Sequence, residues 1–246
     1  MKLIINADDF GISRGANYGI IDAYKNGVVR STSIMAGMPA FDHAIELLKS
    51  CDGLEGLGCG VHLTLSANKP VLNTHKTIVD ENGFFYKRIS EERIKNDFDL
   101  EEIYNEFSAQ IQKVINMGIE ITHLDSHHHV HTLKALKPVI ERLTKEYKLP
   151  IRGGLLYDLN YDKVVPYSGF FYDKTVNIDG FKKLEISKYE VLETMTHPAY
   201  IDNYIMENSS YNLKRIEELN VLTSKELKDY IEEAGITLCN FGDIYK

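Results

Sequence analysis

A chain of 246 residues with 43% hydrophobic and 26% charged content can bury one large core and has the composition of an ordinary globular protein. Its net charge of −8, without a block of lysine or arginine, argues against a nucleic-acid or anionic-membrane partner. No stretch approaches the roughly 20 apolar residues of a membrane span, and no signal-peptide pattern is present, so we expect a cytoplasmic single-domain protein over residues 1–246. The three cysteines lack CxxC spacing and predict neither a disulfide framework nor a zinc knuckle.

The N-terminal part of the chain predicts three strands separated by helices. Residues 2–7 are a mostly apolar run typical of a buried parallel strand, and Asp8 and Asp9 follow at its carboxyl end. Ser13 is a suitable N-cap for the first helix. The expected elements are a strand over 2–7, a helix over 16–25, a strand over 30–36, a helix over 40–50 and a strand over 58–65, which carries His62.

Residues 66–97 have no clear period, which predicts a functional loop or lid. Two aromatic residues in it, Phe84 and Phe85, could stack on a sugar or could simply fill the rim of the core. Both interpretations remain open from the sequence.

Five histidines and an aspartate fall within the nine positions of residues 123–131, His-Leu-Asp-Ser-His-His-His-Val-His. A helix over 100–116 and a short strand over 118–122 precede this segment, and a helical period from 132 to about 147 follows it. We therefore expect the histidines on a strand-to-helix loop, at the edge of an α/β fold where ligands collect. A run in the middle of the chain is not a terminal tag, so we interpret it as half of a metal site.

The C-terminal part adds two more candidate site residues. Arg152 lies in a short expected strand over 150–154, and His197 ends an expected strand over 191–197. The sequence gives no firm assignment for residues 157–182. The remaining expected elements are helices over 211–219 and 224–234 and a strand over 236–241.

Alternation of strands and helices six or seven times in one domain favours an α/β fold of the irregular (β/α) barrel type, resembling a TIM barrel, over a doubly wound sheet. The candidate residues support this choice. Asp8 with Asp9, His62, the histidine segment, Arg152 and His197 would come from the ends of five different strands, and a closed barrel brings such ends together.

One carboxylate with two imidazoles is a common ligand set for a catalytic divalent metal that keeps positions open for water and substrate. Asp8 or Asp9, His62 and a histidine of 123–131 could supply it, and the other carboxylate could act as base on a water whose pKa the metal lowers. Consecutive strand residues point to opposite faces, so both carboxylates reach one site only if the pleat breaks, which Gly11 would permit. The same geometry counts against a glycosidase, whose two carboxyl groups face each other across a sugar.

Five motifs in order resemble those of the YdjC/ChbG-like carbohydrate deacetylases. They are Asn6-Ala-Asp-Asp-Phe-Gly, Asn17-Tyr-Gly-Ile-Ile-Asp-Ala, Gly60-Val-His-Leu-Thr-Leu, Thr122-His-Leu-Asp-Ser-His-His-His-Val-His and Thr196-His-Pro. Five motifs in sequence are a far more specific signal than any one of them. The resemblance implies an irregular barrel of about seven strands, often a homodimer, that removes acetyl groups from N-acetylated sugars or oligosaccharides such as chitooligosaccharides.

The resemblance also implies a role for each residue. Asp9, His62 and His127 would bind one divalent metal ion, and Asp8 would be the base. Similarity to the wider polysaccharide deacetylase group implies His197 as the acid and Arg152 as the residue that orients Asp8. A set of two histidines and one aspartate suits zinc, and more water ligands would also allow magnesium, manganese or cobalt.

Among the remaining residues of the segment, His123, His129 and His131 are expected to support ligands, pack the loop or contact substrate, and Asp125 could orient one of them. Residues 157–188 depart from the family pattern, so the resemblance does not assign the residues that line the sugar site.

The leading hypothesis is a metal-dependent hydrolase in which Asp8 deprotonates the attacking water and His197 protonates the departing amine. Two alternatives remain. The same centre could hydrolyse another amide or a phosphoester, or the chain could be a non-catalytic sugar- or metal-binding protein on this fold. Turnover of N-acetylglucosamine oligomers would distinguish the leading hypothesis from the first alternative. Metal binding without acetate release would indicate the second alternative.

Overall fold

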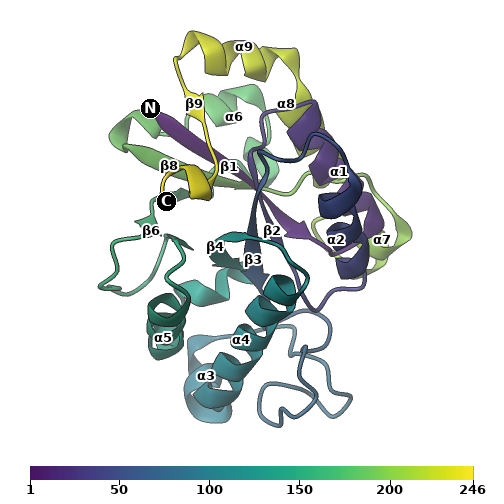
Figure 1. The fold of residues 1–246 in the computed structure, drawn as a ribbon, viewed down its shortest axis with the longest axis vertical. Helices are drawn as coiled ribbons and strands as arrows, with labels where there is room; N and C mark the ends of the chain where they lie inside the picture. Colours follow the sequence, from purple (N-terminus) through teal and green to yellow (C-terminus); the bar gives the residue numbers. More distant parts are fainter. Residues whose placement is uncertain (246) are drawn as a thin grey trace.

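A sheet of parallel strands forms the centre of the protein, and the computed structural model describes residues 1–245 (Figure 1). The strands are β1 (Lys2–Phe10), β2 (Ser31–Ile34), β3 (Gly58–Leu63), β4 (Ile121–Ser126), β5 (Ile151–Arg152), β6 (Val164–Val165), β7 (Tyr167–Ser168), β8 (Val191–Thr196) and β9 (Thr237–Leu238). Their hydrogen-bonded order is β6-β5-β4-β3-β2-β1-β8-β7, and β9 pairs with the start of β1. From Leu3 to Phe10 the central strand β1 is fully buried, as its apolar sequence predicts.

The sheet curls into a nearly closed barrel through the segment that the sequence left unassigned. Strands β6 and β7 are two pieces of one stretch interrupted by Pro166, which has no N–H to donate. β6 pairs with β5 and β7 pairs with β8, while the carbonyl of Pro166 accepts from the backbone N–H of Glu193 at 2.8 Å. Counted as one strand, this stretch joins β1 to β5 and β8 in a ring of seven. The predicted irregular (β/α) barrel is confirmed.

Helices pack around the outside of the ring (Figure 1). They are α1 (Arg14–Lys25), α2 (Phe41–Ser50), α3 (Glu91–Asp97), α4 (Leu100–Asn116), α5 (Lys137–Tyr147), α6 (Ile178–Lys182), α7 (Asn203–Asn208), α8 (Lys214–Thr223) and α9 (Lys225–Glu233). The side chain of Ser13 caps α1 by accepting from the N–H of Ala16, as predicted. Helix α4 buries Ile103, Phe107 and Ile111 on one side, which is the apolar face that its sequence indicates.

Three short helices were not predicted, namely α3, α7 and α6, which lies in the stretch without a firm assignment. Helix α5 begins later than predicted. Helix α3 lies in the stretch expected to be irregular and buries only Ile94, while α7 buries only Ile205. One buried residue gives no helical period, so neither element has a recognisable pattern. Helix α5 starts at Lys137 rather than at residue 132, because a 3₁₀ turn over Lys134–Leu136 precedes it.

The loop between β3 and α3 is fixed to the barrel at its first half. Glu106 of α4 is fully buried and accepts from the backbone N–H groups of Val71 at 2.8 Å and Leu72 at 3.1 Å. Further along the loop, Phe85 is 4% exposed and belongs to the main core, whereas Phe84 is 40% exposed. Phe85 therefore fills the rim of the core, and only Phe84 presents an accessible ring.

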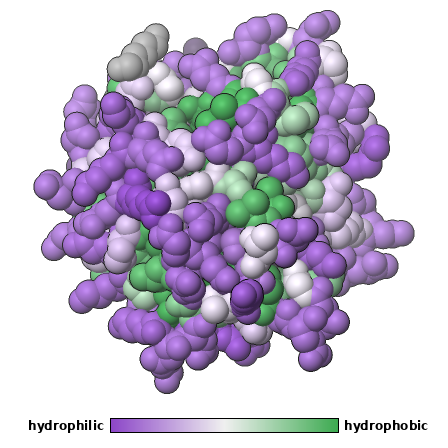
Figure 2. All heavy atoms as spheres, turned by 60° about the horizontal axis from the view of Figure 1, so that its bottom comes forward, coloured by the Kyte–Doolittle hydropathy of each residue, from purple (hydrophilic) through white to green (hydrophobic). Residues whose placement is uncertain are grey.

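The surface shown in Figure 2 is largely hydrophilic, with small hydrophobic areas between the polar side chains. Among residues 1–245, no helix is both long enough and apolar enough to cross a membrane.

Candidate active site

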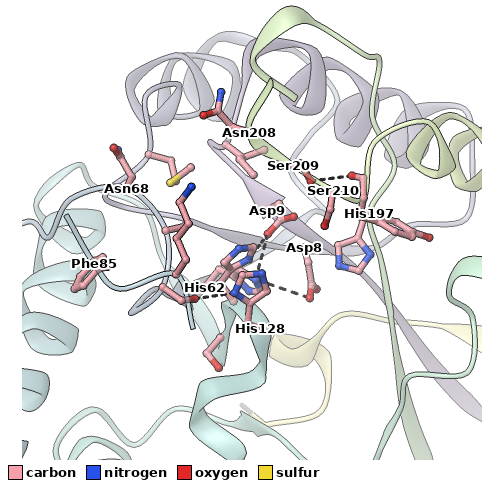
Figure 3. A pocket seen from close by; sticks show the side chains of 18 of the residues that line it. Asp8, Asp9, His62, Asn68, Phe85, His128, His197, Asn208, Ser209 and Ser210 are labelled. Atoms are coloured by element: carbon pink, nitrogen blue, oxygen red, sulfur yellow. Dashed lines mark hydrogen bonds and ion pairs between the residues drawn. The ribbon is translucent and has the colours of Figure 1, made fainter. Parts of the chain in front are cut away.

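Both carboxylates at the end of β1 face one site because the strand is irregular there. The register of β1 against β2 shifts between Ala7, which pairs with Thr32, and Phe10, which pairs with Ile34. Asp9 has a φ of 68°, in the left-handed region that residues other than glycine rarely adopt. The sequence attributed the break to Gly11, but the structure places it at Asp9 itself. Figure 3 shows Asp8 and Asp9 side by side at the centre of the site.

Asp9, His62 and His127 form a cluster whose candidate ligand atoms all lie within 4.8 Å of one another. Oδ1 of Asp9 is 3.4 Å from Nε2 of His62 and 3.0 Å from Nδ1 of His127. His62 belongs to β3, and His127 is the first residue after β4. The structure thus brings together the three residues that the sequence proposed as ligands.

Asp8 lies beside this cluster and forms an ion pair with Arg152. The guanidinium donates to both carboxylate oxygens of Asp8, at 2.7 Å and 2.6 Å, and also contacts Asp125 at 2.9 Å. Burial raises the pKa of Asp8, but Arg152 outweighs it and lowers that pKa below the ordinary value. Arg152 is fully buried, so it can position Asp8 but does not line the cleft.

The carboxylate of Asp125 orients His62, not a histidine of its own segment, so that part of our expectation is wrong. Nδ1 of His62 donates to Oδ1 of Asp125 at 2.9 Å, and the Ser33 hydroxyl donates to Oδ2 at 2.8 Å. The reason is that β4 continues to Ser126, so that Asp125 is inside the barrel opposite β3 and not on the loop. With Nδ1 occupied, Nε2 of His62 faces Asp9.

The local electrostatics fit a cation at the cluster. Burial lowers the pKa of His62, but Asp125 and Asp8 outweigh it and raise the value to about 10, so a positive charge is favoured at this imidazole. Burial raises the pKa of Asp9, yet His127 and Arg215 hold it well below its ordinary value, so the carboxylate stays ionised. An ionised carboxylate and two imidazoles in a negative field are a suitable donor set for a divalent metal.

A second set of residues also has candidate ligand atoms close enough together to bind an ion, namely Asp8, His62 and Asp125. Two of its members already have strong partners, because Arg152 donates to both oxygens of Asp8, and Asp125 accepts from His62 and Ser33. The Asp9 cluster is therefore the better candidate for a metal site.

His197 follows β8 and faces the same cleft from the opposite side, as Figure 3 shows. Its backbone N–H donates to the carboxylate of Glu218, and its Nδ1 lies 3.6 Å from Oε1 of the same group. The rings of Tyr172 and Tyr211 pack edge-on against the imidazole. The side chain is only 13% exposed, so its orientation is restricted.

Sequence reasoning missed two residues of α8 that touch the site. Nη2 of Arg215 donates to Oδ2 of Asp9 at 2.7 Å, and Glu218, one turn further, contacts His197. A signal was present in the sequence, because Arg215 and Glu218 share the buried face of this helix with Leu219 and Leu222. Charged residues are rarely buried without a partner, so a charged residue on the apolar face of a helix predicts an ion pair or hydrogen bond elsewhere in the fold.

The other histidines of the segment divide into two kinds. His123 and His131 are fully buried: His123 stacks on Phe241, and His131 contacts the hydroxyl of Ser126. His128 and His129 line the cleft in left-handed backbone conformations, with φ of 53° and 52°. Burial lowers the pKa of both to about 4, so these imidazoles are neutral.

These groups open into a cleft of about 960 Å³, which is large for a small-molecule site. One wall comes from the loop after β3, including Asn68 and Phe84. Another comes from the end of α7 and the residues after it; Figure 3 shows Asn208 and Ser209 there, across the cleft from Asn68. Hydroxyl and amide groups beside aromatic rings suit a polar ligand with apolar faces.

Replacing Asp125 with asparagine should weaken metal binding by about 10- to 100-fold, because the charge that orients His62 and favours a cation is lost. Competition against a chelator of known affinity measures the effect. Asp80→Asn is a matched control, since Asp80 lines the same cleft outside the cluster. Unchanged affinity in Asp125→Asn would show that Asp125 does not support the metal site.

Comparison with known proteins gives one family match and three similar proteins. The sequence matches the family of YdjC-like proteins over residues 2–233. It is 40% identical to a carbohydrate deacetylase of Vibrio campbellii, over 99% of this chain and 96% of the relative, and 41% identical to a carbohydrate deacetylase of Listeria monocytogenes, over 99% of this chain and 100% of the relative. A crystal structure from Enterococcus faecalis, described as a cellobiose-phosphate cleavage protein, has a TM-score of 0.90 at 38% identity and covers 99% of this chain and 98% of its own.

Proposed function

This chain belongs to the YdjC-like protein family, and on that premise we propose that it is a metal-dependent carbohydrate deacetylase acting on N-acetylated sugars or oligosaccharides. Its full-length relatives make it an enzyme of the carbohydrate deacetylase class. The observation that carries the proposal for the site is the meeting of a base, a metal-ligand cluster and an acid in one cleft. Asp8, the Asp9 cluster and His197 all line it.

The metal is assigned to Asp9, His62 and His127, where it would supply positive charge that polarises the acetamide carbonyl and makes water more nucleophilic. Asp8 takes the proton from the attacking water. The bidentate pair with Arg152 keeps this carboxylate ionised and fixes its direction. Asp125 holds the ring of His62 so that Nε2 faces Asp9.

On the other side of the cleft, His197 protonates the departing amine. Its Nδ1 lies 3.6 Å from Oε1 of Glu218, which leaves Nε2 to give a proton to the substrate. The carboxylate of Glu218 also accepts from the backbone N–H of His197 and from the hydroxyl of Tyr211, so the pair is fixed. Acid and base therefore act from opposite walls of one site.

Replacing His197 with alanine should cripple hydrolysis of an N-acetyl sugar, because an amine is a poor leaving group without a proton. An activated acetate ester needs little such help, so the variant should keep much of its esterase activity and all of its metal. Paired rate measurements on the two substrates check this. An equal loss on both would contradict the acid role and indicate that His197 is structural.

The substrate assignment is tested by incubating the protein with N-acetylglucosamine and its disaccharide and with phosphorylated disaccharides, each with zinc, magnesium, manganese or cobalt. We expect acetate release from the N-acetylated sugars. Phosphate release or cleavage of the phosphorylated sugar without acetate would favour a different hydrolase, which the description of the Enterococcus faecalis relative makes worth including.

A further inference from the structure

Arg215 is a buried cation at the proposed metal site that has no role in the chemistry derived so far. Its side chain reaches from α8 to the end of β1, where Nη2 donates to Oδ2 of Asp9 at 2.7 Å. Nε donates to the backbone carbonyl of Tyr211 at 2.7 Å, so the guanidinium is fixed at two points. The residue is 3% exposed, and such a buried cation is stable only with a partner of this kind.

The contacts of Asp9 divide between its two oxygens. Oδ1 faces the cluster, with Nε2 of His62 at 3.4 Å and Nδ1 of His127 at 3.0 Å. Oδ2 accepts the hydrogen bond from Arg215. The left-handed backbone of Asp9 is uncommon for a residue with a side chain, and the fixed guanidinium helps to hold the carboxylate in this orientation.

We propose that Arg215 is a positioning residue that occupies one oxygen of Asp9, so that only Oδ1 is offered to the metal, and that it thereby sets which divalent ions the site prefers. The inference rests on the proposed function, because it assumes that Asp9, His62 and His127 hold the ion. It concerns the metal preference of the site and not the reaction itself.

The chemical reason lies in the ligands that different ions require. One carboxylate oxygen and two imidazole nitrogens suit zinc or cobalt, which accept few ligands and favour nitrogen donors. A carboxylate that offers both oxygens adds a hard donor and raises the coordination number, which favours manganese or magnesium. A guanidinium on Oδ2 prevents this second contact and also places a positive charge near the ion.

The test compares Arg215→Met and Arg215→Lys with the unchanged protein. Arg142→Met is a matched control, since Arg142 also pairs with a carboxylate, that of Glu101, but on the exposed surface. Affinities for zinc and manganese are measured by competition with a chelator, and the visible absorption of the cobalt-loaded protein reports the coordination number. Circular dichroism and thermal melting establish that each variant is folded.

We expect the preference for manganese over zinc to increase by about 10-fold or more in Arg215→Met, the scale on which groups behind metal ligands act. The cobalt absorption should weaken, as it does when coordination increases towards six. The metal preference and cobalt spectrum of Arg215→Lys should lie between those of the unchanged protein and those of Arg215→Met. The reason is that one ammonium cannot bind both Asp9 and the Tyr211 carbonyl. If Arg215→Met does not fold, the intermediate shift in Arg215→Lys carries the test.

A zinc-to-manganese preference and a cobalt spectrum that are unchanged in the folded variants would overturn the inference. That outcome, in a protein that binds metal and releases acetate, would leave the proposed function intact. Failure of the unchanged protein to bind any of these ions would instead contradict the proposed function.

Discussion

Replacing Asp8 with asparagine should lower acetate release by about 10²-fold or more, the usual scale of a lost general base, while the metal stays bound. Asp8 is the carboxylate that Arg152 holds through both oxygens, and neither oxygen approaches the imidazoles of the Asp9 cluster as closely as Oδ1 of Asp9 does. Asparagine keeps the size of the side chain but cannot accept the proton of the attacking water. Rates on an N-acetyl sugar and metal content of the same preparations measure both effects.

The adjacent substitution Asp9→Asn is the matched comparison. Asp9 contacts His62 and His127 through Oδ1, so loss of its charge should weaken metal binding first and activity as a consequence. High metal concentration should then restore part of the activity of Asp9→Asn but none of that of Asp8→Asn. Two variants that respond alike would show that the division into base and ligand is wrong.

Replacing either His62 or His127 with alanine should reduce metal affinity by more than the roughly 100-fold that loss of a supporting group costs, because a direct donor is removed. Acetate release should fall with it at any metal concentration that leaves the site unsaturated. Metal analysis after gel filtration and the rate on an N-acetyl sugar measure the two losses together.

His128→Ala controls for the histidine-rich character of this segment. His128 follows His127 directly, packs against its ring with the centroids 3.9 Å apart, and lines the cleft. Its Nδ1 contacts the hydroxyl of Ser66 at 2.8 Å, and it contributes no ligand atom to the cluster. Its replacement should leave the metal in place. Loss of metal in His128→Ala together with retention of metal in His127→Ala would show that the third ligand is His128 and not His127.

The sequence predicted the barrel because most strands and helices have a clear period of apolar residues. Helix α4 was predicted with its observed bounds, since apolar residues recur on one face along its whole length. The closure through β6 and β7 could not be predicted. Each piece has two residues, Pro166 interrupts them, and their pairing depends on β5 and β8, which lie elsewhere in the sequence.

The candidate site was predicted where motifs carried it and missed where only the fold brings residues together. These residues lie at the carboxyl ends of strands or directly after them, and a barrel gathers such positions: Asp8, Asp9, His62, His127 and His197. Arg215 and Glu218 lie in a helix near the C-terminal end, and only the packing of α8 against the ends of β1 and β8 brings them to the site. The pairing of Asp125 with His62 was missed for a related reason, since it depends on how far β4 extends.

Acetate release during metal titration tests whether this protein is a metal-dependent deacetylase. Protein freed of metal with a chelator is given increasing amounts of one divalent ion, and acetate release from an N-acetylglucosamine disaccharide is followed together with bound metal. We expect activity to be absent at the start, to rise in proportion to bound metal and to saturate at one ion per chain. Full activity in the metal-free protein, or saturation with metal without any acetate release, would contradict this expectation.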